Sequence, residues 1–562
     1  MIKLTKYQQV LKYQYKMKAR IFLSKVLKNL VNFSTHYFNL IRNMKFFNNC
    51  LFACLLLIVS TNTVKAFPQQ QYPSATPFPV RGFHLDLRIQ VMKLPALKAL
   101  ALQLNKSGIN TLIMEYEASF PYEKHPLIAN RYAYTKLEII DFVNYCKTLS
   151  IDVIPLQQSF GHLEYVLKNN RYKEQREDQK DFSQICPSKE NLNRIFFTEL
   201  YTELAALHPS KYIHIGGDET HLLGHDAPCK AKVAKTSVSK LYGDHIKMLC
   251  QIVIGMGKIP VLWADIALKY PDAIKDLPKE AIFVDWNYGW DLDKFGDHKK
   301  LMQSGFEIWG AVSLRSSPDN YNLTMWDKHF NNIHDFLPAA RNLNYKGMMM
   351  TSWSTSGVYS AVNESGFDIV DLYAVRRVYP LSAFNMLIAA FAEALKDTTA
   401  LNTAVFIEKY CNNNYGLTPA TSKMFWNALK TTPYEVVMGE VKGPISLVDL
   451  LDSSKLALKT ISSIQPLKNT TEFAQYLLMA EIRVEYLTYQ WIEKQVNTAG
   501  ISENAQNLLV KQLETLIIET KNTNKKFTNL NSAYYYVSEL EADNNLRIQK
   551  MELLYNRLSK NR

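Results

Sequence analysis

The chain has 562 residues, of which 47% are hydrophobic, and this predicts a globular protein too long for one ordinary core, with two folded units. A formal net charge of +13 would favour a nucleic-acid or anionic-membrane ligand. However, eleven Lys and Arg and no Asp or Glu fall within residues 1–66, which leaves +2 for residues 67–562. The basic character belongs to the N-terminal segment, and we expect no nucleic-acid partner.

Residues 44–66 have the pattern of a secretory signal peptide. One Lys precedes a short apolar stretch, and small residues occupy the −3 and −1 positions of a cleavage site before Phe67. The apolar stretch is too short to span a bilayer comfortably, so we expect export to the periplasm or the cell exterior without stable membrane insertion. Because a signal peptide begins near the N-terminus, we expect residues 1–43 to be an upstream extension. A long basic n-region or an organelle-targeting segment is the alternative.

The remaining chain divides by composition into three parts. Residues 67–80 are rich in Pro and Gln and predict a linker. Across residues 81–400, short apolar runs alternate with helical patterns, which predicts a parallel sheet, and eight such units fit an α/β fold of the (β/α)8 barrel type. Residues 401–562 carry apolar residues at helical spacing and predict an α-helical domain. The predicted strands are Gly82–Leu87, Thr111–Tyr116, Val153–Gln157, Tyr212–Gly216, Pro260–Ala264, Ile282–Trp286, Phe306–Gly310 and Met348–Trp353.

Five cysteines would remain after cleavage before Phe67. Their odd number and wide spacing are typical of neither a disulfide scaffold nor a zinc site, so we expect no metal. Cys146 and Cys250 fall in apolar helical patterns and are interpreted as core residues. Cys186 and Cys229 fall in loops and could pair in an oxidising compartment.

The strongest chemical signal is Lys211-Tyr-Ile-His-Ile-Gly-Gly-Asp-Glu-Thr220, in which a strand ends in two glycines and two adjacent acids. Neighbouring side chains of a continuing strand would point to opposite faces. A turn at Gly216 and Gly217 lets Asp218 and Glu219 face one site at the carboxyl end of the strand. Two close acids in different surroundings acquire different pKa values, which suits general-acid chemistry. The alternative is an acidic pair that caps the next helix.

His214-Ile-Gly-Gly-Asp-Glu resembles the signature of glycoside hydrolase family 20, the β-N-acetylhexosaminidases. Arg81-Gly-Phe-His-Leu-Asp86, Phe160-Gly-His162 and Leu262-Trp-Ala-Asp265 resemble other strands of the same family. Met114-Glu-Tyr-Glu-Ala-Ser-Phe-Pro-Tyr122 and Gln158-Ser-Phe-Gly-His-Leu-Glu-Tyr-Val166 are most similar to its hexosaminidase D branch. This resemblance covers about residues 81–400.

The resemblance implies exo-acting, substrate-assisted, retaining hydrolysis of terminal β-linked GlcNAc or GalNAc, with no cofactor. The substrate's acetamido oxygen would attack the anomeric carbon, Glu219 would act as general acid and then base, and Asp218 would orient and stabilise the acetamido group. Substrate-binding residues would come from the ends of several strands. They are Arg81, Glu115, His162, Trp263, Asp265, Trp286 and Trp353, with Trp309 a weaker candidate, Glu117 a second acid on strand 2, and Asp86 an organising residue.

The sequence departs from better-known relatives around Trp309-Gly-Ala-Val-Ser-Leu-Arg315, where many of them carry a Tyr and an Asp. Tyr288 and Tyr321 are the candidates for the missing acetamido contact. Two other functions stay open. One is a barrel glycosidase that uses two protein carboxylates, Glu219 with Asp265 or Asp285, and the other is an inactive sugar-binding barrel.

Overall fold

A computed structural model describes residues 78–88, 91–291, 294–316, 319, 321–353, 362–363, 374–375, 380–431, 433–437 and 439–560. The predicted leader and residues 67–77 of the predicted linker lie outside these ranges. Within the described ranges, none of the helices is both long enough and apolar enough to cross a membrane.

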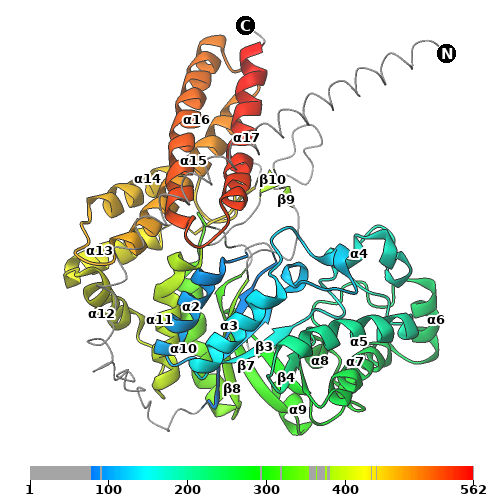
Figure 1. Ribbon diagram of the computed structural model, residues 1–562. Helices are drawn as coiled ribbons and strands as arrows, with labels where there is room; N and C mark the ends of the chain where they lie inside the picture. Colours follow the sequence, from blue (N-terminus) through cyan, green and yellow to red (C-terminus); the bar gives the residue numbers. More distant parts are fainter. Residues whose placement is uncertain are drawn as a thin grey trace, which may run out of the picture. The chain divides into compact units, whose positions relative to one another are not determined.

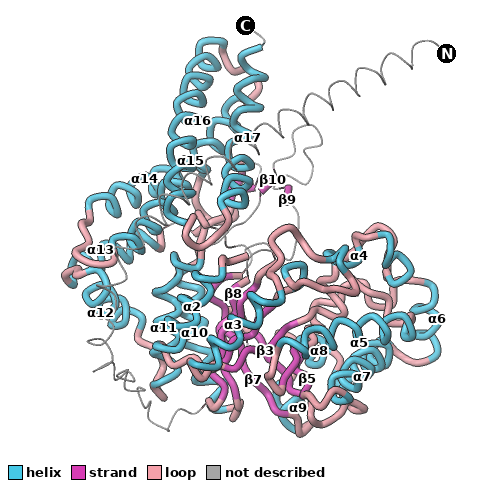
Figure 2. The backbone as a smooth tube through the Cα atoms, in the orientation of Figure 1, coloured by secondary structure: helices cyan, strands magenta, loops and turns pink. Residues whose placement is uncertain are grey.

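Eight parallel strands close into a barrel in chain order, with β8 hydrogen-bonded to β1, and this confirms the predicted α/β barrel. Figure 2 shows these strands at the centre of the fold, with helices around them. The strands are β1 (Val80–Asp86), β2 (Thr111–Glu115), β3 (Asp152–Leu156), β4 (Tyr212–His214), β5 (Ile259–Trp263), β6 (Ile282–Trp286), β7 (Glu307–Arg315) and β8 (Gly347–Ser352).

Alternation along each strand divides the barrel into an inner and an outer layer, because successive side chains point to opposite faces. In β6, Ile282, Val284 and Trp286 belong to the apolar cluster inside the barrel. Phe283 lies in the cluster between the strands and the surrounding helices. Because all eight strands are parallel, their C-terminal ends share one end of the barrel, where a (β/α)8 fold carries its functional groups.

Ten helices accompany the barrel in the described part of the chain. One of them, over residues 136–148, starts with a capping box, in which Thr135 and Glu138 each accept a backbone hydrogen bond from the other residue. The helices are α2 (Leu94–Lys106), α3 (Lys136–Thr148), α4 (Glu164–Leu167), α5 (Glu190–Leu207), α6 (Ala227–Lys235), α7 (Val238–Gly255), α8 (Asp265–Lys269), α9 (His298–Gln303), α10 (Trp326–Asn342) and α11 (Asn385–Lys396).

The C-terminal region is helical, as predicted, and Figure 1 shows its last helices in orange and red beside one another. Consecutive helices from α14 to α17 pack against each other. The helices are α12 (Thr403–Tyr415), α13 (Pro419–Leu429), α14 (Leu447–Ser463), α15 (Thr470–Val496), α16 (Glu503–Asn531) and α17 (Val537–Lys560). Two short antiparallel pairs, β9 (Val362–Asn363) with β10 (Ala374–Val375) and β11 (Val436–Val437) with β12 (Glu440–Val441), complete the sheets.

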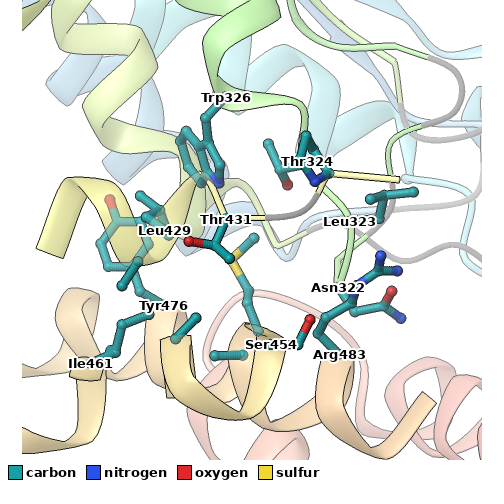
Figure 3. Close-up of a pocket in the computed structure, with 15 residues that line it drawn as sticks. Asn322, Leu323, Thr324, Trp326, Leu429, Thr431, Ser454, Ile461, Tyr476 and Arg483 are labelled. Atoms are coloured by element: carbon teal, nitrogen blue, oxygen red, sulfur yellow. The ribbon is translucent and has the colours of Figure 1, made fainter. Parts of the chain in front are cut away.

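The helical region packs directly on the barrel. Met92, in the segment between β1 and α2, forms an antiparallel β-bridge with Tyr535, which lies between α16 and α17. Trp326 of α10 packs on Tyr476 of α15 with ring centroids 6.0 Å apart. Figure 3 shows a pocket at this junction, lined by residues of α10, α13, α14 and α15. The described lining of this pocket includes none of the predicted catalytic residues.

Candidate active site

The two glycines after β4 turn the chain as the sequence predicts. Gly216 and Gly217 have φ values of +68° and +92°, which other residues rarely adopt. A Cβ on Gly216 would lie 2.0 Å from Oε1 of Gln158, so the neighbouring strand end also requires glycine there. The next residues, Asp218 and Glu219, leave the strand direction at the C-terminal end of the barrel.

Asp218 and Glu219 both contact one imidazole. Nε2 of His162 lies 3.5 Å from Oδ2 of Asp218 and 3.2 Å from Oε2 of Glu219, and all three atoms lie within 4.8 Å of one another. The Asp218 side chain is only 7% exposed, whereas the Glu219 side chain is 42% exposed. The neighbouring acids therefore converge on one site, with one carboxylate sheltered and the other open to solvent.

The charges of this trio determine which groups carry protons. Burial alone would lower the pKa of His162, but the charge of Asp218 and hydrogen bonds with both carboxylates raise it well above its ordinary value. The hydrogen bond from His162 lowers the pKa of Glu219 despite the opposing effect of burial. The ground state therefore has a protonated His162 beside an ionised Glu219.

Asp265, at the start of α8, forms hydrogen bonds with the backbone of Glu219 and with the Trp286 indole. Its Oδ2 accepts a 3.1 Å hydrogen bond from the backbone N–H of Glu219, and its Oδ1 accepts one of 3.4 Å from the Trp286 indole. Burial and the nearby charge of Asp218 raise the pKa of Asp265 to about 8. Asp265 is therefore protonated at neutral pH, and it positions Glu219 through the backbone.

A second charged cluster lies at the ends of β1 and β2, and its cation is one that sequence reasoning missed. Arg88 donates from Nε to both Asp86 oxygens at 3.1 Å and approaches Glu115 at 3.8 Å. His84 contacts Glu115 at 2.7 Å. Nη1 of Arg88 has no hydrogen-bond partner among the described residues. The Asp-x-Arg spacing at the end of the first strand was the signal that could have identified Arg88.

Glu117 follows this cluster with a fully buried carboxyl group. Burial and the neighbouring charge of Glu115 raise its pKa well above the ordinary value, although Arg88 opposes the shift. The pKa of Glu115 moves the other way, because Arg88 and His84 outweigh the effect of burial. The cluster therefore pairs one ionised carboxylate with one neutral carboxyl group.

Three of the predicted tryptophans lie at the C-terminal end of the barrel. Trp353 is half-buried and donates from Nε1 to the Tyr288 hydroxyl at 2.9 Å. Cζ of Arg88 lies over the Trp353 ring, 5.3 Å from its centroid. Trp286 is also half-buried and packs against Tyr288, with the ring centroids 5.0 Å apart. Trp263 is fully buried and packs against Trp353, with the ring centroids 5.7 Å apart. Trp286, Tyr288 and Trp353 thus form one aromatic surface.

Three sequence-based assignments are wrong because the residues lie elsewhere. Arg81 is the second residue of β1 and lies at the opposite end of the barrel, where its Nε donates to the Gly108 carbonyl at 2.7 Å. Trp309 lies near the start of β7 and is fully buried, with its indole bonded to Glu307. Tyr321 donates to Oε1 of Gln475 in α15 at 2.5 Å. None of the three is placed to bind a sugar at the C-terminal end.

The position of Asp285 excludes one of the alternative catalytic pairs, Glu219 with Asp285. Asp285 precedes Trp286 on β6, so its side chain points outward from the barrel. It accepts a hydrogen bond from the Tyr345 hydroxyl at 2.6 Å and contacts His298 at 2.9 Å. Asp285 therefore cannot act together with Glu219 across a substrate.

Residues 85–308 match the family model described as glycosyl hydrolase family 20, catalytic domain. This chain carries a glycoside hydrolase family 20 catalytic domain. The protein is accordingly a glycoside hydrolase, and the matched range includes the glycine turn, both acids, His162 and Asp265.

The family 20 region is similar to curated proteins over about half of this chain. Hexosaminidase D of Bos taurus is 28% identical over 302 residues, which cover 51% of this chain and 87% of the relative. Hexosaminidase D of Homo sapiens is 28% identical over 307 residues, covering 52% of this chain and 63% of the relative. Beta-hexosaminidase subunit beta of Mus musculus is 23% identical, covering 48% of this chain and 51% of the relative.

Solved structures are also similar to part of this chain. A beta-N-acetylhexosaminidase from Bacteroides fragilis aligns with a TM-score of 0.45 and 16% identity, covering 60% of this chain and 70% of that one. A GH20 exo beta-N-acetylglucosaminidase from Vibrio harveyi aligns with a TM-score of 0.42 and 17% identity, covering 58% and 55%.

Proposed function

We propose that this glycoside hydrolase is an exo-acting β-N-acetylhexosaminidase that removes terminal non-reducing β-linked GlcNAc or GalNAc by substrate-assisted retaining catalysis. The observation that carries the proposal is the convergence of Asp218 and Glu219 on one nitrogen of His162. One sheltered carboxylate and one exposed carboxylate on the same side of the chain are what this mechanism requires. The similarity to hexosaminidases supports the same choice.

In the proposed reaction, the acetamido oxygen of the substrate attacks the anomeric carbon and the bond to the leaving oxygen breaks. Glu219 gives that oxygen its proton, and Asp218 stabilises the positive charge that develops on the acetamido nitrogen. Water then attacks the anomeric carbon of the cyclic intermediate and returns a proton to Glu219. The acetamido group is regenerated, so the sugar leaves with retained configuration.

A proton must reach Glu219 before the first step, since its pKa is lowered in the ground state. His162 is the proposed donor, because its Nε2 lies 3.2 Å from Glu219 Oε2 and its pKa is raised. Transfer of one proton between these atoms leaves a neutral imidazole and a protonated Glu219. Substrate binding favours this transfer by removing water from the exposed carboxylate.

The remaining two-carboxylate alternative would use Asp265 as the nucleophile. A pKa of about 8 keeps Asp265 protonated at neutral pH, and a protonated carboxyl group is a poor nucleophile. Both of its oxygens also accept hydrogen bonds from Glu219 and Trp286. These contacts favour a positioning role for Asp265, and they favour the substrate's own amide as nucleophile.

The test compares aryl β-N-acetylhexosaminides whose N-acyl group is acetyl or successively fluorinated acetyl. Fluorine weakens the amide oxygen as a nucleophile, so we expect kcat/KM to fall with each fluorine. Glu219→Gln should nearly abolish turnover of poor leaving groups and retain binding, and Asp218→Asn should lose about a hundredfold or more in kcat. A rate that is independent of the N-acyl group would overturn the proposed mechanism.

Two finer points belong to the same proposal. Paired gluco- and galacto-configured chromogenic substrates would determine the preferred sugar, and the similarity to the hexosaminidase D proteins leads us to expect activity on the galacto form. We also propose export, on the signal-peptide pattern of residues 44–66. N-terminal sequencing of the exported protein should find a chain that begins at Phe67, and an uncleaved intracellular chain would contradict it.

A further inference from the structure

A second cluster of ligand-type side chains lies outside the catalytic trio. Glu177, Cys186, Asp226 and Cys229 place one oxygen or sulfur atom each within 4.8 Å of all the others. Two members precede α5, and two belong to the N-terminus of α6. Three of them are buried and Asp226 is half-buried, so most of the cluster is shielded from bulk solvent.

The distances within the cluster are those of a small tetrahedral site. The two Sγ atoms lie 3.6 Å apart, Cys186 Sγ lies 3.0 Å from Asp226 Oδ2, and Cys229 Sγ lies 3.4 Å from Glu177 Oε2. A tetrahedral Zn²⁺ with bonds of about 2.3 Å to sulfur and about 2.0 Å to oxygen needs separations of about 3.8 Å and about 3.5 Å. The cluster therefore needs only small adjustments to enclose such an ion.

The backbone holds the two carboxylates so that one oxygen of each remains for the centre of the cluster. Oδ1 of Asp226 accepts the N–H of Cys229 at 2.7 Å and caps α6. Oε1 of Glu177 accepts the N–H groups of His225 and Asp226 at 2.6 and 3.1 Å. The oxygens that remain, Oδ2 and Oε2, are those that face the thiols.

Among the described residues, the two acids of this cluster have no cationic partner. No Lys, Arg or His in the described ranges forms an ion pair with Glu177 or Asp226, although both are at least half-buried. Burial raises the pKa of Glu177, and the neighbouring charge of Asp226 adds to the effect. An ionised carboxylate buried without a positive partner is unfavourable, so each acid either takes up a proton or gains a cation, and a bound metal ion would supply that cation.

We propose that Glu177, Cys186, Asp226 and Cys229 bind one structural zinc ion. On binding, each thiol releases its proton to solvent, and two thiolates and two carboxylates surround the dication. Mixed sulfur and oxygen donors in a closed four-ligand site suit zinc. Cys229 occupies the third position of α6, where the helix dipole stabilises a thiolate.

A disulfide between the two cysteines is the competing outcome, and the carboxylates argue against it. Oxidation would remove both S–H donors and leave Oδ2 of Asp226 and Oε2 of Glu177 facing sulfur atoms that cannot donate. Two partly or fully buried carboxylate oxygens would then lose their partners, which is costly. Zinc satisfies all four atoms at once.

The proposed zinc would join the two loops that carry the catalytic groups. The segment with Cys186 holds the His162 loop through hydrogen bonds from Ile185 N–H to the Phe160 carbonyl and from Leu163 N–H to the Ser183 carbonyl, both 3.0 Å. Asp226 ends the loop that starts at Asp218. Bound zinc would thus fix the spacing between the histidine and the acids.

The first test is metal analysis of the full chain, purified without chelators and dialysed against metal-free buffer. We expect one zinc per chain in the wild type and in His162→Ala, which removes the other possible ligand cluster. The double variant Cys186→Ala/Cys229→Ala should contain none. Cys250→Ala, which removes a buried thiol of α7 outside the cluster, is the matched control and should keep its zinc. Zinc that persists in the double variant, or a zinc-free wild type, would overturn the proposal.

A second measurement needs no variant, so it stands even if the double variant fails to fold. Replacement of zinc by Co²⁺ should give the absorption of thiolate-to-cobalt charge transfer and of tetrahedral cobalt. The chain denatured in EDTA without reductant should then titrate with all of its cysteines as free thiols. A cobalt spectrum without thiolate bands, or a deficit of two thiols from a disulfide, would refute the zinc site.

Discussion

Nε2 of His162 lies 3.2 Å from Oε2 of Glu219, and both residues have left-handed backbone conformations, with φ of +57° and +45°. Such a conformation costs a non-glycine residue about 1 kcal/mol or more. Close packing between the two loops holds it, since a Cβ on Gly161 would lie 2.6 Å from the Asp218 carbonyl oxygen. The strain is thus located where the histidine meets the two acids.

This contact leads to a prediction for the pH profile. His162 and Glu219 share one proton that the reaction requires, and the raised pKa of His162 keeps it bound above the ordinary range of histidine. In His162→Ala that proton resides on Glu219 alone, whose ordinary pKa is lower. We expect the basic limb of kcat/KM to move down by about one pH unit or more.

The measurement is the pH dependence of kcat/KM on an aryl N-acetylhexosaminide. His334→Ala is the matched control, because His334 is exposed and contacts only Asp335 among the described residues. Its profile should coincide with that of the wild type. A basic limb that stays in place in His162→Ala would show that the two residues do not share the catalytic proton.

Asp265 provides a prediction for stability. Its pKa of about 8 lies above the value of about 3.9 in the unfolded chain, so the folded state binds the extra proton between these limits. Stability therefore falls as pH rises through that window. Asp265→Asn removes this loss, and we expect the Tm of the variant relative to wild type to increase from pH 5 to pH 8.

The same position separates charge from hydrogen bonding. Asp265→Asn keeps an oxygen for the Glu219 N–H and should keep most activity below pH 7, whereas Asp265→Ala leaves that N–H and the Trp286 indole unpaired. We expect the Ala variant to lose about tenfold more kcat than the Asn variant. Equal losses in the two variants would argue against a protonated, hydrogen-bonding Asp265.

The strands and both acids could be predicted because they depend on local patterns. Seven predicted strands agree with the observed ones to within two residues at each end, and β6 has the predicted bounds, whereas β7 continues five residues beyond the predicted end at Gly310. Gly216 and Gly217 signalled the turn that brings Asp218 and Glu219 together, since few other residues adopt their backbone conformations. Such features need no knowledge of distant contacts.

The errors concern direction and distant partners. Arg81 was assigned to the site although it is the second residue of β1, and the strand places Arg88 at the functional end instead. Tyr321 was misassigned because its partner Gln475 is 154 residues away in a helix whose packing the sequence does not specify. Cys186 and Cys229 do come together, but the two carboxylates beside them reach the thiols only through loop geometry.

Arg88 should support the fold as well as the site. Arg88→Met would leave Asp86 and Glu115 buried without their guanidinium, and we expect unfolding free energy at pH 7 to fall by about 3–5 kcal/mol. Arg88 is one reason why the pKa of Glu115 is lowered, and this stabilisation is lost progressively as pH falls from the unfolded-state value of about 4.3 toward that lowered pKa. The deficit should therefore shrink in acid.

Urea unfolding at pH 7 and at about pH 3 would measure this difference, because pH 3 lies within the window in which the contribution is lost. Arg194→Met is the control, because the pair of Arg194 with Glu190 on α5 is exposed and should contribute less than about 1 kcal/mol. A loss at Arg88 no larger than at Arg194 would mean that the buried cluster does not depend on its cation.

Gly216 allows the glycine turn itself to be tested against a matched position. Gly216→Ala places a methyl group 2.0 Å from the Gln158 side chain, whereas Gly257→Ala, at a similar φ of +73°, meets nothing within 4 Å. Both variants bear the backbone strain of about 1 kcal/mol. Only Gly216→Ala also meets the buried Gln158, first at its side-chain oxygen and then at its Cα, 3.1 Å from the added methyl group. Either Gln158 or the turn that carries Asp218 and Glu219 must move, so we expect kcat/KM to fall at least tenfold in this variant, while Gly257→Ala keeps its activity and loses only stability. Thermal melts and kinetics on both proteins separate the two effects, and equal activities would show that the acids tolerate movement of the turn.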